Sequence, residues 1–303
     1  MSSVELGLTG AACRVRFRAI WDFAFGIRMM RLASVLISLA IVIASETAGA
    51  NESVEFTDAG TTFHGVLFKP QGPGPFPSVV ALHGCGGLVN RSGKIVQRFQ
   101  DWGDRLSSAG LAVLFPDSFT TRGLSPQCRI SERSVRSARE RVADAQAARR
   151  WLLGQDWIAK NRVSLMGWAN GGSASLWAAR PQAVPRDGAS DFRSVIAFYP
   201  GCIRLSQAAW SARIPTMILI GRADDWTPAA ACEQMVAGAR GRSARASIVV
   251  YPGAYHEFDR PDYPVRVLTG LARSADGSGR AHVGTNPAAR DDAIRKVSQF
   301  LVR

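Results

Sequence analysis

The chain has 303 residues, of which 47% are hydrophobic and 20% are charged, a composition typical of a globular protein with one large α/β domain. The formal net charge of +13 is high, yet the basic residues are scattered along the chain. No zinc-finger, helix-turn-helix or aromatic RNA-binding pattern accompanies them, so we expect no nucleic-acid partner.

The first fifty residues predict an N-terminal extension plus a signal peptide. Met29-Met30-Arg31 supplies a start and a positive charge, residues 32–44 are apolar, and Ala48-Gly49-Ala50 is a small-residue cleavage site. The apolar stretch is shorter than the roughly 20 residues that span a bilayer. We expect cleavage after Ala50, export to the periplasm or medium, no stable membrane insertion, and a single domain over residues 51–303. An uncleaved membrane anchor is the alternative.

The rest of the chain predicts strands alternating with helices. Residues 53–57 and 61–68 alternate apolar and polar side chains, like an antiparallel pair joined at 58–60. The further strands are expected at 78–83, 111–115, 163–168, 194–199, 215–220 and 246–251. The helices are expected at 96–108, 134–153, 173–179, 228–239 and 286–301, and residues 257–285 read as a long surface excursion.

This order of elements predicts a doubly wound, mostly parallel sheet of about eight strands with helices on both faces. In such a sheet the loops at the carboxyl ends of the strands share one edge. Residues 84–87, Ala169, Asp224 and His256 therefore meet there, although they lie far apart in the sequence.

The segment Gly167-Trp168-Ala169-Asn170-Gly171 follows an apolar strand and precedes a small-residue helix. A strand, a G-x-S-x-G turn and a helix together make a nucleophile elbow, in which the middle residue attacks the substrate. Glycine is needed at 167 and 171 because a Cβ on either side of the strained turn would clash. Here the middle residue is Ala169, which has no reactive atom.

The acid and base of a hydrolase triad follow the nucleophile in the order acid, then histidine. Asp224 ends a strand in a Gly-x-x-Asp-x-x-x-Pro loop, where a carboxylate can orient an imidazole, and Asp225 is the second choice. His256 lies on the loop after the last strand and is the candidate base.

His83-Gly84-Cys85-Gly86-Gly87 matches an HGGG-type oxyanion loop. The backbone N–H groups of Cys85 and Asn170 are the candidate donors to a developing oxyanion. A plain glycine-rich turn is the alternative interpretation of this segment.

The four cysteines after residue 50 contain no C-x-x-C pair, so the sequence predicts neither a metal site nor a cofactor. We expect the disulfides Cys85–Cys128 and Cys202–Cys232, because each pair would lie in loops on the same edge of the sheet. Four free buried thiols are the alternative, which an oxidising compartment disfavours.

These motifs together, with Pro116-Asp117-Ser118-Phe119 and Tyr255-His256-Glu257-Phe258, resemble the dienelactone hydrolase family of the α/β-hydrolase fold, and in particular its exported branch. The resemblance implies opening of lactones and carboxylic esters, with Asp224 as the acid, His256 as the base and Ala169 at the nucleophile position.

Three explanations of Ala169 stay open. The chain can be an inactive protein that binds a small ester, lactone or carboxylate. A relocated nucleophile can act, with Cys85, Ser118 and Ser173 as candidates. Water activated by His256 can give weak turnover.

Four further side chains could line the site. Arg122 could pair with a substrate carboxylate, although a solvated arginine is the favoured interpretation. Trp168, Trp226 and Phe119 could form pocket walls, and core packing explains them equally well.

Overall fold

A computed structural model describes residues 51–302, so the predicted extension and signal peptide lie outside the described residues. Eight strands form one sheet in the order β1-β2-β4-β3-β5-β6-β7-β8. Strand β2 is antiparallel to both its neighbours, and all pairs from β4 to β8 are parallel. The strands are β1 (Glu52–Asp58), β2 (Thr61–Phe68), β3 (Phe76–Leu82), β4 (Ala112–Pro116), β5 (Ile158–Trp168), β6 (Val195–Phe198), β7 (Thr216–Gly221) and β8 (Ala246–Tyr251).

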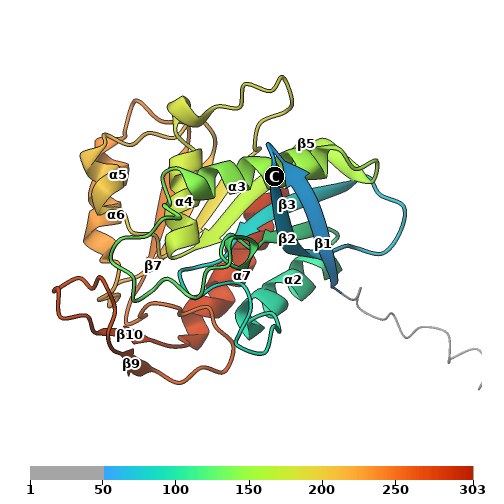
Figure 1. Ribbon diagram of the computed structural model, residues 1–303. Coiled ribbons are helices and arrows are strands. Elements are labelled where there is room, and N and C mark those ends of the chain that lie inside the picture. The colour runs from blue at the N-terminus through green and yellow to red at the C-terminus, as the bar shows by residue number, and fades with distance from the viewer. Residues whose placement is uncertain (1–50, 303) are drawn as a thin grey trace, which may run out of the picture. The chain divides into compact units, whose positions relative to one another are not determined.

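Helices cover both faces of this sheet (Figure 1). They are α2 (Gln97–Ser108), α3 (Glu140–Leu153), α4 (Asn170–Ala178), α5 (Ile203–Gln207), α6 (Ala229–Gly238) and α7 (Pro287–Val302). Helices α2 and α7 share one face, where Arg290 pairs with Asp101 at 2.6 Å, and α3 and α4 lie on the other. The predicted α/β-hydrolase fold, with its mostly parallel sheet of about eight strands, is confirmed.

The core follows from the continuous apolar strands of the sequence. Every residue of β4, β6 and β7 is buried, as expected for strands covered on both faces. Trp168 stacks on Phe198 with ring centroids 5.6 Å apart and on Phe115 at 6.1 Å. This aromatic layer lies directly beneath the elbow that follows β5.

Several predicted element boundaries differ from those in the structure. Helix α3 begins at Glu140 rather than at residue 134, because the Glu140 carboxylate accepts the Arg136 N–H at 2.8 Å and closes a separate turn. Helix α4 begins at Asn170, three residues earlier than expected. The excursion contains a two-stranded sheet of β9 (Arg266–Leu268) and β10 (Ala281–Val283), whose three-residue strands are too short to show periodicity.

Candidate active site

The elbow has the backbone geometry that the sequence predicts. Ala169 lies between β5 and α4 with φ 49° and ψ −111°, a region that residues with a Cβ rarely occupy. A Cβ at Gly167 would lie 2.4 Å from the Gly171 carbonyl oxygen, and one at Gly171 would lie 2.1 Å from that of Leu82. Both glycines are therefore required by the close approach of backbone around the turn.

Asp224 and His256 form a buried pair. Asp224 follows β7 and His256 follows β8, and the imidazole Nδ1 lies 2.8 Å from the Asp224 Oδ2. Asp224 is held in turn by its Oδ1, which accepts the N–H groups of Trp226 at 2.9 Å and Thr227 at 2.8 Å. Because the carboxylate faces Nδ1, that nitrogen carries the proton and Nε2 is left for a reacting group.

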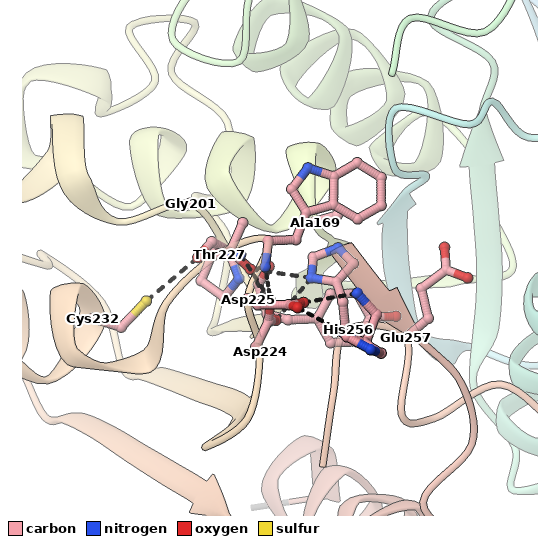
Figure 2. Close-up of polar contacts among 12 residues, drawn as sticks. Ala169, Gly201, Asp224, Asp225, Thr227, Cys232, His256 and Glu257 are labelled. Atoms are coloured by element: carbon pink, nitrogen blue, oxygen red, sulfur yellow. Dashed lines mark hydrogen bonds and ion pairs between the residues drawn. The ribbon is translucent and has the colours of Figure 1, made fainter. Parts of the chain in front are cut away.

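The end of β6 joins this pair to the elbow. The N–H of Ala169 donates to the Phe198 carbonyl at 3.0 Å, and the hydroxyl of Thr227 donates to the next carbonyl, that of Tyr199, at 3.0 Å. The Tyr199 ring also packs on the His256 ring, with centroids 4.5 Å apart. Figure 2 shows Ala169, Thr227 and His256 grouped in this region.

The glycine loop after β3 lies against the elbow. A Cβ at Gly84 would be in van der Waals contact with the Ala169 methyl, at 3.5 Å. Within residues 51–302, the N–H groups of Cys85 and Asn170 donate to no protein acceptor. Two free backbone donors beside a close-packed turn are suited to an anionic oxygen from a ligand.

His83, at the start of this loop, is a structural residue. It is fully buried; its Nδ1 lies 2.8 Å from the Gly84 carbonyl, and its Nε2 accepts the Ser118 N–H at 3.1 Å. Burial, followed by the positive charge of Arg141, lowers the pKa of His83 to about 3. The ring is therefore neutral at pH 7 and orders the loop.

Each candidate for a relocated nucleophile is occupied or enclosed. Cys85 is in a disulfide with Cys128, and Ser118 is fully buried. The Ser173 hydroxyl donates to the Ala169 carbonyl at 3.1 Å and accepts the Gly201 N–H at 2.8 Å. The second expected disulfide, Cys202–Cys232, is also present.

The other residues that the sequence suggested for the site differ in their contacts. Asp225 does not bond to His256 but pairs with His282 at 2.7 Å, and both side chains of that pair are partly exposed. Arg122, favoured as a solvated side chain, instead pairs with the buried Asp144 at 2.6 Å, which corrects that expectation. Trp226 lies 4.7 Å from the His256 ring, whereas Trp168 and Phe119 are core residues.

The sequence did not point to the residues that support His256. Thr227 holds the carboxylate of Asp224 through its backbone N–H, and Tyr199 packs on the imidazole. Glu257 is 3.1 Å from Arg98. Burial opposes ionisation of Glu257, but Arg98 and Arg260 outweigh burial and lower its pKa to about 2. In the sequence, the position of Glu257 directly after His256 is the feature that could have pointed to it.

A cavity of about 770 Å³ has none of Ala169, Asp224 and His256 in its lining. Its lining residues come from β1, β2, α2, the segment after the glycine loop and the loop after β4, and they include Leu88, Lys94 and Asp117. Among residues 51–302, no helix is long and apolar enough to cross a membrane.

Comparisons with known proteins agree with this architecture. A family model described as the dienelactone hydrolase family matches residues 63–303. A dienelactone hydrolase from Anabaena variabilis ATCC 29413 has a similar structure, with TM-score 0.58 and 17% identity over 84% of this chain and 98% of that one. Esterase 2 of Thermogutta terrifontis, phosphoramylated by tabun, has TM-score 0.59 and 18% identity over 86% and 96%. No curated protein matches. The chain thus belongs to the dienelactone hydrolase family.

Proposed function

We propose that this chain binds a small carboxylic ester, lactone or carboxylate at the elbow without forming a covalent intermediate. The observation that carries the proposal is Ala169 in an intact elbow geometry beside a hydrogen-bonded Asp224–His256 pair. The free N–H groups of Cys85 and Asn170 would hold a carbonyl or carboxylate oxygen of the ligand. A methyl group cannot attack that carbonyl, so the acyl-enzyme step is lost.

A second candidate function is slow hydrolysis by water. The orientation of His256 by Asp224 supports it, because an imidazole held in this tautomer can accept a proton from water through Nε2. In a triad protease, loss of a triad member leaves roughly 10³–10⁴-fold catalysis over water. Water-based turnover would therefore be weak and would leave no covalent adduct.

A fluorophosphonate probe and a short-chain p-nitrophenyl ester, used on the wild type and on Ala169→Ser, separate these functions. We expect the variant to be labelled and to turn over the ester, and the wild type to do neither. Ester turnover by the wild type without labelling would favour the water route. Strong labelling of the wild type would contradict the proposal, because it requires a nucleophile elsewhere.

The role of Asp224 as the acid can be tested in Ala169→Ser by substituting Asp224 and its chain neighbour Asp225 in turn. Asp224→Asn should lower the labelling rate of Ala169→Ser by about 10⁴-fold, as loss of the orienting carboxylate does in a triad protease. Asp225→Asn should change it little, because Asp225 pairs with His282 at 2.7 Å instead. Equal effects of the two substitutions would refute the role of Asp224.

We also propose that the chain is exported and that its mature form begins at Asn51 as a single hydrolase domain of the exported branch. The pattern of residues 29–50 and the pairing of all four later cysteines support this. N-terminal sequencing of protein from the periplasm and the medium tests it. An intact residue 1–50 segment on cytoplasmic protein would rule it out.

A further inference from the structure

A buried carboxylate behind the Asp224–His256 pair has no part in the function proposed above. Asp259 is fully buried and accepts three hydrogen bonds. Its Oδ2 accepts the indole N–H groups of Trp102 and Trp168, both at 2.8 Å. Its Oδ1 accepts the hydroxyl of Tyr199 at 2.5 Å. Three donors and no competing acceptor suit an ionised carboxylate.

Two of these donors adjoin the site on opposite sides. Trp168 is the last residue of β5 and precedes Ala169 in the chain. Tyr199 follows β6, and its ring packs on His256 at 4.5 Å. Asp259 itself lies three residues after His256. One carboxylate therefore ties the elbow to the loop that carries the histidine. The third donor, Trp102 of α2, is adjacent in the chain to neither of them, although its ring packs on that of Trp168 with centroids 6.2 Å apart.

Stability alone does not account for a carboxylate in this position. Burying a charge among aromatic rings is costly, and well-packed apolar residues are often at least as stabilising as a buried ionic group. The backbone nearby is also strained, with φ 35° at Tyr199 and φ 60° at Glu257. Strain and a buried charge held together at one place indicate a geometric requirement.

Arg98 supports the same arrangement from α2. Its Nη1 donates to the Tyr199 hydroxyl at 3.0 Å and lies 3.1 Å from Glu257. Burial raises the pKa of the Tyr199 phenol, so the hydroxyl keeps its proton and donates to Asp259. The hydrogen bonds run from Arg98 through Tyr199 to Asp259, and this order fixes the Tyr199 ring against His256.

We propose that Asp259 is a positioning residue that sets the His256 ring relative to the elbow by holding Trp168 and Tyr199. The assignment rests on the proposed function in so far as His256 is the base. The two indoles provide a matched pair, because each donates one N–H to the same oxygen at the same distance and both are buried. Of the two, only Trp168 is next to Ala169 in the chain.

The kinetic test measures the labelling rate of Ala169→Ser by a fluorophosphonate, with a second substitution added in turn. Trp168→Phe, Tyr199→Phe and Asp259→Asn should each lower the rate at least tenfold, since small displacements of a base from its partner cost up to about 10²-fold. Trp102→Phe should change the labelling rate by no more than about twofold, although this substitution should destabilise the fold as Trp168→Phe does. Equal rate losses for the two tryptophan variants would overturn the proposal.

A second test needs no activity. In the otherwise wild-type chain, the low-field NMR resonance of the His256 Nδ1 proton reports its bond to Asp224. Tyr199→Phe and Asp259→Asn should shift or broaden this resonance, and Trp102→Phe should not. If Ala169→Ser is inert, the proposed function fails while this measurement still decides the role of Asp259. An unchanged resonance in Tyr199→Phe and Asp259→Asn would then refute it.

Discussion

Arg141 of α3 donates through Nη1 to the Asn170 Oδ1 at 3.2 Å and through Nη2 to the His83 carbonyl at 2.8 Å. Its side chain is fully buried. One guanidinium thus links the first residue of the elbow helix to the start of the glycine loop. These are the two segments whose N–H groups we propose as donors to the ligand, so Arg141 fixes their separation.

Arg141→Met is expected to lower the free energy of unfolding by about 2 kcal/mol, the scale of hydrogen bonds from a charged donor. It should also slow fluorophosphonate labelling of Ala169→Ser by about tenfold, because the two donors lose their common anchor. Arg149→Met is the control. Arg149 is a buried arginine of the same helix, but it bonds to Asp187 and to the Ser190 carbonyl. Arg149→Met should lower the free energy of unfolding without changing the labelling rate of Ala169→Ser.

The two disulfides should differ in function but not in stability. They close segments of 43 and 30 residues, so removing either should cost about 4 kcal/mol in the chain-entropy account. Cys85→Ser with Cys128→Ser should also slow labelling of Ala169→Ser, because it frees the glycine loop. The corresponding change at Cys202 and Cys232 should not. Denaturant unfolding and labelling rates measure both effects, and equal labelling losses would contradict this.

Acid should destabilise the fold through His83. Its pKa falls from 6.5 to about 3 on folding because the ring is buried and faces Arg141, with Asp117 3.7 Å away opposing the shift. Below pH 6.5 the unfolded chain binds a proton at this ring that the folded chain does not, so stability falls as the pH is lowered towards 3.

Between pH 7 and pH 5 this difference amounts to about 2 kcal/mol. Urea unfolding at the two pH values measures it. His83→Gln, whose amide oxygen can still accept the Ser118 N–H, should be less stable at pH 7 but should lack this part of the pH dependence. If the stability of His83→Gln falls between pH 7 and pH 5 as much as that of the wild type, other groups cause the loss of stability.

The sequence predicted what depends on local spacing and on strand order. Buried apolar runs predicted β3 to β7, and the rule that the carboxyl ends of parallel strands share one edge predicted that Asp224 and His256 lie close together. Glycine at 167 and 171 predicted the elbow, and the structure accounts for both, because a Cβ at Gly167 would lie 2.4 Å from the Gly171 oxygen and one at Gly171 would lie 2.1 Å from the Leu82 oxygen.

Side-chain partners across the fold could not be predicted in this way. Asp259 meets Trp102 and Trp168 across 157 and 91 residues, and no spacing rule connects them. The pairing of Arg122 with Asp144 could not be predicted either, because the two lie 22 residues apart in different elements. The start of α3 was misplaced because Glu140 bonds backward to Arg136 and ends the helical pattern there.

Ala169 is held in a strained backbone conformation. A residue with a Cβ at φ 49° and ψ −111° costs roughly 1–3 kcal/mol, whereas glycine adopts this conformation freely. Glycine adds entropy to the unfolded chain worth about 1 kcal/mol, so Ala169→Gly should stabilise the fold by about 1 kcal/mol net. Ala174→Gly, four residues after Asn170 in the regular part of α4, should instead destabilise it by about 1 kcal/mol or more. If urea unfolding shows that both substitutions lower the free energy of unfolding, the backbone at position 169 is not strained by the alanine side chain.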